Sequence, residues 1–188
     1  MRGAIAIAVA ASLGVATAVA AFALRAGNGV SESASSPRPV WSEVHWPFPV
    51  DQWGKGKAFQ CSAQNCGVEV KLYLRAKLGS CDCTSGIAND DELARMSDFD
   101  LVGGKVVPLR AGEPITVAWM KGRSGTYTLS DRNSSGKTAL SVVFNDRCDM
   151  VVATAVLPRQ HLATIEPAVM TFLNTGTVLR WAEVTLGL

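Results

Sequence analysis

The sequence has 188 residues, of which 48% are hydrophobic and 18% are charged, and its formal net charge is +2. The two excess positive charges, Arg2 and Arg25, lie near the N-terminus, and the rest of the chain carries equal numbers of acidic and basic residues. Proteins that bind nucleic acid usually show a basic excess or a basic stripe. Neither is present, so nucleic-acid binding is excluded as a class of function.

The first 25 residues predict a targeting segment. Residues 3–24 carry no charge and follow the positively charged Arg2, which is typical of an export signal. Ala18 and Ala20 form an A-x-A pattern for cleavage by a signal peptidase. The run is also long enough to span a bilayer, which takes about 20 residues. Residues 1–25 are therefore either a cleaved signal peptide or an apolar helix that anchors the protein in the membrane, and both predict a periplasmic location.

A linker and one folded domain follow this segment. Residues 26–40 are rich in Ser, Gly and Pro and show no apolar periodicity, so they predict a flexible linker. Residues 41–188 have a normal size for a single domain with one hydrophobic core.

The first half of the domain predicts a hairpin and a helix. Residues 68–78 alternate between apolar and mostly charged side chains, as in a strand that packs one face on a core. Residues 57–61 fit as its partner, joined through the turn "SAQN". Residues 89–97 predict a short helix with Asn89 as its cap and Glu92 completing a capping box. Leu93 and Met96 would then face inward.

The second half predicts four strands and two helices. "PITVAWM" and "TYTLS" flank a Gly-containing turn, "KGRSG". "TALSVVF" and "MVVATAVL" flank "NDRCD" and are apolar on both faces, so they predict central strands that are covered on both sides. Residues 165–176 have the apolar spacing of an amphipathic helix. Residues 177–188 favour a final helix, with a strand as the alternative.

Together these elements predict an α+β fold. Hairpins followed by helices indicate a mainly antiparallel sheet of about six strands with the C-terminal helices packed on one face. This layout is similar to sheet-plus-helix domains of the PsbP/Mog1 type, which is a likeness of architecture alone.

Three segments resemble a set of uncharacterised exported proteins from alphaproteobacteria of the rhizobial kind. The segments are "WPFPVDQWGKGKAFQC", "FNDRCDMVVATAV" and "EPAVMTFLNTGTVLRWAEVTLGL". The resemblance implies an exported single domain and supplies no catalytic residue.

The five cysteines predict disulfide bonds. Cys61, Cys66, Cys81 and Cys83 are separated by four, fourteen and one residues, and neither pair has the C-x2-C spacing of a zinc ribbon. Thiols of an exported chain meet oxidising conditions. Cys61 and Cys66 flank a short turn and would lie within reach of each other, and either Cys81 or Cys83 could pair with Cys148. Two such disulfides would use four of the five cysteines and leave one free thiol. A metal site and a reactive thiol remain the alternatives.

The aromatic residues of the segment before the first hairpin are a further candidate site. They could form a groove for a sugar or peptide, or they could pack over the sheet; they are Trp41, Trp46, Phe48 and Trp53. His45 and His161 belong to no recognisable catalytic constellation. The sequence therefore predicts no catalytic residue, no metal site and no cofactor.

These observations predict an exported envelope protein that binds a partner or ligand without catalysing a reaction. Its expected partners are the membrane, through residues 1–25 if they are retained, and another envelope protein. The alternative is a thiol-redox or metal-handling protein that uses Cys81, Asp82 and Cys83.

Overall fold

The computed structural model describes residues 39–80, 85–103, 105–130 and 136–188. The predicted targeting segment and most of the predicted linker lie outside these residues. Within the described part of the chain, no helix is long and apolar enough to cross a membrane.

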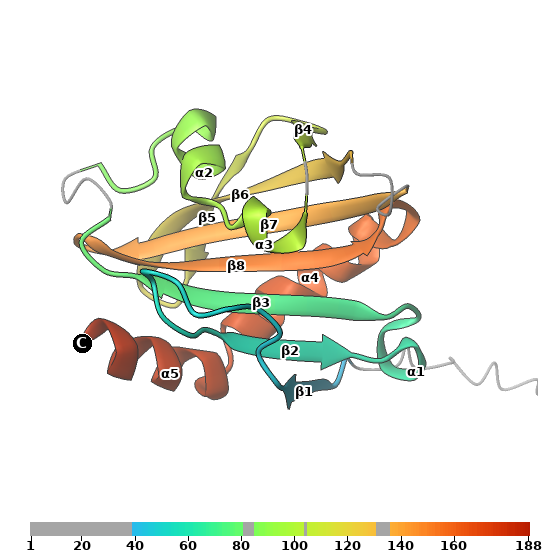
Figure 1. Ribbon diagram of the computed structural model, residues 1–188, viewed down its shortest axis with the longest axis horizontal. Coiled ribbons are helices and arrows are strands. Elements are labelled where there is room, and N and C mark those ends of the chain that lie inside the picture. The colour runs from blue at the N-terminus through green and yellow to red at the C-terminus, as the bar shows by residue number, and fades with distance from the viewer. Residues whose placement is uncertain (1–38, 81–84, 104, 131–135) are drawn as a thin grey trace, which may run out of the picture. The chain divides into compact units, whose positions relative to one another are not determined.

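The domain is built on one antiparallel sheet with helices on both faces (Figure 1). The strands are β1 (Trp41–Val44), β2 (Lys57–Cys61), β3 (Val70–Lys77), β4 (Val106–Pro108), β5 (Glu113–Val117), β6 (Met120–Leu129), β7 (Lys137–Asp146) and β8 (Asp149–Pro158). Their order is β1-β2-β3-β8-β7-β6-β4, and β5 also pairs with β6. The helices are α1 (Ala63–Cys66), α2 (Asp90–Met96), α3 (Phe99–Val102), η1 (Arg159–His161), α4 (Leu162–Leu173) and α5 (Gly176–Leu186).

The α+β class, the antiparallel sheet and the C-terminal helices are confirmed. Among the described residues the sheet has eight strands rather than about six, because the short β1 and β4 lack a periodic apolar pattern. In Figure 1, α4 and α5 lie behind the sheet, while α2 and α3 lie in front of it.

The main core lies between the sheet and the two C-terminal helices. Leu72 and Leu74 of β3 contribute to it, together with alternate residues of β7 and β8. Ile165 and Val169 come from α4, and Val178 comes from α5. Since α5 buries residues at helical spacing, the helical reading of residues 177–188 is correct.

The predicted turn "KGRSG" is wrong. β6 runs straight through it, and the chain reverses instead between Val117 and Met120, which face each other across the hairpin. Ala118 has a positive φ of 52° in this turn. Gly122 is needed in the strand for close approach, because a Cβ there would lie 2.1 Å from the backbone oxygen of Val143. Glycine at this position therefore marks dense packing rather than a turn.

The predicted Asn89 cap of α2 is confirmed, whereas the predicted capping box is formed with the residue before the cap. The backbone N–H of Glu92 donates to the side-chain oxygen of Asn89 at 2.9 Å. The Glu92 carboxylate in turn accepts from the backbone N–H of Ala88 at 2.7 Å. Leu93 and Met96 are buried, as expected. The helix is thereby fixed over the front of the sheet, where it contacts β6 and β7.

Candidate functional site

Cys61 and Cys66 form a disulfide, with their Cα atoms 5.9 Å apart. The geometry differs from the predicted hairpin, because Cys61 lies opposite Val70 in the sheet and Cys66 ends the one-turn helix α1. Cys148 is also disulfide-bonded. Its predicted partners, Cys81 and Cys83, lie outside the described residues. The two described cysteines near β2 therefore act as a covalent staple.

The four aromatic residues of the predicted groove lie in different packing environments. Trp41 stacks on Phe172 of α4, with ring centroids 5.1 Å apart. Trp46 is only 3% exposed and packs edge-on against Phe48 at 5.1 Å. Trp53 lies elsewhere, beneath the ammonium group of Lys77 at 5.7 Å from the ring centroid. Trp46 and Phe48 are thus brought together, whereas Trp41 and Trp53 pack against other elements.

A buried ionic cluster lies on the front face of the sheet, where the sequence predicts a solvent-exposed charged surface. Arg75 and Lys77 project from β3 and are 5% and 6% exposed. Asp98, between α2 and α3, is equally buried at 5%. The fourth member, Asp51, comes from the segment between β1 and β2, and its side chain is 42% exposed. This cluster is the functional candidate that the sequence analysis missed.

Asp98 is the centre of the cluster. The Arg75 guanidinium donates to both of its carboxylate oxygens, with Nε 3.0 Å from Oδ2. Lys77 Nζ lies 2.9 Å from Asp98 Oδ1 and also donates to the backbone oxygen of Met96 at 2.6 Å. Arg75 further donates through its NH1 group to Asp51. These bonds tie both the α2–α3 segment and the β1–β2 segment to the sheet.

The electrostatics of the cluster follow from burial and pairing. Desolvation lowers the pKa of Arg75, but the hydrogen bonds and charges of Asp98 and Asp51 outweigh it and raise that pKa above its ordinary value. Desolvation also raises the pKa of Asp51, but the backbone N–H of Trp53 and the Arg75 guanidinium outweigh it and lower that pKa. Arg75 and Asp51 are therefore both ionised at neutral pH.

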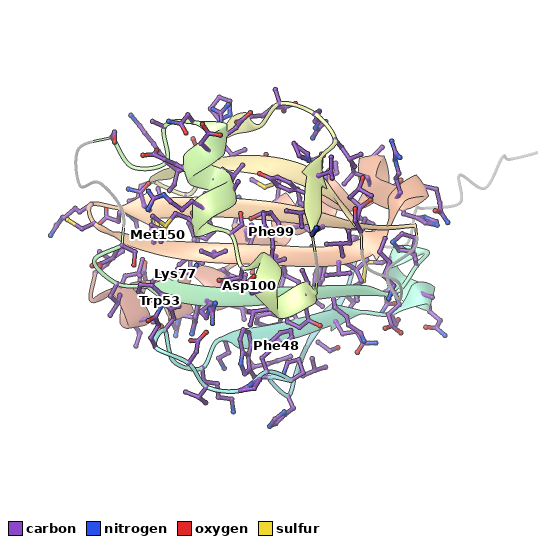
Figure 2. The ribbon with its side chains drawn as sticks, turned by 45° about the horizontal axis from the view of Figure 1, so that its top comes forward. Phe48, Trp53, Lys77, Phe99, Asp100 and Met150 are labelled. Carbon is purple, nitrogen blue, oxygen red and sulfur yellow. A yellow bond between two sulfur atoms is a disulfide. The ribbon has the colours of Figure 1, made fainter. Side chains whose placement is uncertain are left out.

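A polar cavity of about 550 Å³ opens beside this cluster. Figure 2 shows Lys77 and Trp53 side by side on the front of the sheet, with Asp100 on α3 nearby. Cavities of this size commonly hold small molecules. The lining residues come from the β1–β2 segment, the end of β3 and the α2–α3 segment; those that matter here are Asp51, Gln52, Arg75, Lys77, Arg95 and Asp100.

A second cavity of about 550 Å³ lies between α5 and the first three strands. Its lining is mainly apolar, with Phe59 and Leu74 from the sheet and Trp181 from α5. Its charged pair, Lys57 and Glu43, is substantially exposed at 38% and 50%. Exposed ion pairs contribute little energy, so this cavity has a weaker basis for selecting a polar ligand than the cavity beside Asp98.

The described side chains form no cluster suited to binding a metal ion. No three His, Cys, Asp or Glu side chains gather around a possible metal position within the described ranges. His45 is exposed on the segment after β1, and His161 ends η1. The two histidines therefore come from separate elements, and neither lines the polar cavity.

Comparison with solved structures shows one distant likeness of fold. No protein-family model matches the chain, and no curated protein matches it in sequence. The chain is similar to the crystal structure of PA94 from Pseudomonas aeruginosa, a protein of unknown function named as a proposed regulator. The match has 16% sequence identity and a TM-score of 0.44, and it covers 72% of this chain and 94% of PA94. This likeness is too distant to carry an argument about function.

Proposed function

We propose that the protein is exported to the periplasm and binds a small polar ligand there without catalysing a reaction. Its binding site is the cavity beside Asp98. The observation that carries this proposal is the burial of two cationic side chains, Arg75 and Lys77, against a cavity of about 550 Å³. Burying charge is costly unless pairing compensates it, and a wall of buried, oriented charges provides selectivity for a polar ligand.

Export is supported by two features of the chain. Residues 3–24 carry no charge, and Cys61 and Cys66 are cross-linked, as suits an oxidising compartment. Cell fractionation followed by N-terminal sequencing tests this half of the proposal. We expect the protein in the envelope fraction, either beginning after residue 20 or retaining residues 1–25. A protein confined to the cytoplasm with five free thiols would contradict export.

Binding is tested with two matched lysine variants of β3. Lys77→Met keeps much of the side-chain length but removes the buried ammonium, while Lys71→Met makes the same change at an exposed position on the same face of the strand. A thermal-shift screen of small sugars, amino acids and organic acids supplies the ligand. We expect the ligand to stabilise the wild type and Lys71→Met but not Lys77→Met. No stabilisation of the wild type by any compound would overturn the binding role.

A further inference from the structure

We propose that the ligand of this cavity is a small hydroxy acid, whose carboxylate binds Arg75 and Lys77 by displacing Asp51. This inference rests on the proposed binding function and specifies its ligand. A hydroxy acid combines one carboxylate with hydroxyl groups, as in a sugar acid. Three features of the cavity support this chemistry: spare buried donors, a replaceable internal carboxylate and a polar mouth.

The buried part of the cluster has more donors than it uses. A guanidinium has five N–H groups and an ammonium has three. Among the described contacts, Arg75 donates three hydrogen bonds, two to Asp98 and one to Asp51. Lys77 donates to Met96 and lies against Asp98. Among these contacts two N–H groups of Arg75 have no acceptor, and the Lys77 ammonium, which also lies over the Trp53 ring, has one N–H more than its two acceptors use. A carboxylate, which accepts through two oxygens, is the simplest group that uses them.

The buried charges are also unequal. Arg75 and Lys77 are both nearly inaccessible, and Asp98 is the single acidic side chain of the cluster that is buried to the same degree. The second negative charge comes from Asp51, whose side chain is 42% exposed at the edge of the cavity. The cluster is therefore neutral only while Asp51 stays in contact with Arg75. A ligand carboxylate supplies the same charge to the same guanidinium.

The turn that carries Asp51 has bonds of its own besides the contact with Arg75. Its contact with the cluster runs through one oxygen, Oδ2, while Oδ1 accepts from the backbone N–H of Trp53 at 2.9 Å. The turn around it is held by a backbone bond from Gly54 to the Asp51 carbonyl oxygen at 2.9 Å. Rotation of the exposed side chain would release the Arg75 NH1 group, and the backbone bond from Gly54 would still close the turn. Asp51 thus occupies the position that a ligand carboxylate would take.

The mouth of the cavity suits hydroxyl groups. Gln52 and Asp100 are exposed there and offer an amide and a carboxylate. Hydroxyl groups can donate to the carboxylate and accept from the amide. Asp100 and Arg95 contribute one charge of each sign to the same lining, so these two residues give no net positive charge to attract a second ligand carboxylate. A single carboxylate with a hydroxyl-bearing remainder therefore fits better than a dicarboxylate.

The experiment measures binding of D-glucuronate, with D-glucose as the probe that lacks the carboxylate. Isothermal titration calorimetry is run on the mature protein and on three variants: Asp51→Asn, Lys77→Met and Lys71→Met. Asparagine can keep the Oδ1 bond to Trp53 but removes the competing charge. We expect glucuronate and not glucose to bind the wild type, and Asp51→Asn to tighten glucuronate binding by about tenfold, the scale on which one neighbouring charge shifts an ionic equilibrium. Lys77→Met should abolish binding, and Lys71→Met should leave it unchanged.

Three contrary outcomes separate this inference from the proposed function. If glucuronate binds the wild type but Asp51→Asn weakens or does not change binding, displacement of Asp51 is wrong. If glucose or another uncharged compound binds and Lys77→Met blocks it, the ligand class is wrong while the binding function stands. If neither glucuronate nor any compound of the screen binds, the proposed function and the inference fail together.

Discussion

The guanidinium of Arg75 and the carboxylate of Asp98 form a two-bond ion pair in which both side chains are almost completely buried. The pair joins the C-terminal half of β3 to the residue that precedes α3, 23 residues further along the chain. Lys77 adds a second cation to the same carboxylate. Asp98 therefore fixes the α2–α3 segment on the front of the sheet and shapes one wall of the polar cavity.

Replacing Asp98 with Ala should strongly destabilise the fold. The change leaves Lys77 without its carboxylate and Arg75 with Asp51 alone, and breaking a buried ion pair by removing one partner costs about 3–5 kcal/mol. The free energy of unfolding, measured by urea titration, should fall by this amount. Asp100→Ala is the matched control, because Asp100 is exposed two residues away and should change stability by less than about 0.5 kcal/mol. Equal losses in the two variants would contradict a central role for Asp98.

Trp46→Ala should lower stability rather than act through a binding site. The Trp46 ring is buried against Phe48 and Tyr73, and it lies so close to Gly56 that a Cβ there would approach it to 2.6 Å. Removing a buried aromatic ring typically costs about 3–5 kcal/mol. A large drop in the midpoint of urea unfolding is expected. Trp119→Ala serves as the control, since Trp119 is 50% exposed. Unchanged stability in Trp46→Ala would show that the ring is not part of the packing.

How far the sequence predicts the fold is best seen in β3. The alternation of residues 68–78 correctly predicts a strand with Val70, Leu72 and Leu74 in the main core. The same alternation predicts that Arg75 and Lys77 face solvent, which is wrong. The alternation within one strand does not show whether a carboxylate from another element will cover its charged side chains. The buried cluster depends on Asp98 and Asp51, which are distant in sequence from β3 and from each other.

The acids around α2 illustrate the same limit. The sequence predicts a capping box at Asn89 and Glu92, and the Glu92 carboxylate does accept from a backbone N–H at the start of the helix. Asp90 also accepts from the Arg123 side chain at 2.6 Å and from the backbone N–H of Gly112 at 3.0 Å. Its contact with Arg123 depends on the long strand β6, which runs through residues 121–125, where the sequence predicts a turn. Because a turn was expected where β6 continues, the contact between Arg123 and Asp90 could not be predicted from the sequence.

The Cys61–Cys66 disulfide should stabilise the fold modestly. A link that closes a ring of this size removes unfolded-state entropy equivalent to about 2 kcal/mol, because the two cysteines are only 5 positions apart. The double variant Cys61→Ala/Cys66→Ala should lose about this much in urea titration, less than Asp98→Ala loses. A larger loss would indicate that burial of the two sulfur atoms, rather than the cross-link, is the main contribution.

The number of free thiols distinguishes the structural role of the cysteines from the redox alternative. Cys61, Cys66 and Cys148 are disulfide-bonded, and two intrachain bonds would occupy four of the five cysteines. A thiol assay on exported, denatured and unreduced protein should therefore give one thiol per chain. Three or more thiols per chain, or stoichiometric zinc by elemental analysis, would favour thiol or metal chemistry at Cys81, Asp82 and Cys83.

Stability should fall on acidification through Asp51 and Asp90. The pKa of Asp90 is lowered mainly by the backbone N–H of Gly112 and then by Arg123. The pKa of Asp51 is lowered because the Trp53 N–H and Arg75 outweigh desolvation. Both carboxyls thus bind protons less readily in the folded protein than in the unfolded chain, where their ordinary pKa is 3.8. Their contribution is complete well above pH 3.8 and is lost as the pH falls through the lower folded-state values.

Urea titrations between pH 7 and pH 3 check this dependence. The free energy of unfolding of the wild type should decrease as the pH falls below about 5, where the unfolded carboxyls begin to take up protons. Asp51→Asn and Asp90→Asn should each be less stable than the wild type at pH 7, and each should show a shallower acid slope. The double variant should be shallower than either single variant, because the two ion pairs are separate. If its slope equals that of the wild type, the acid sensitivity arises from other carboxyl groups.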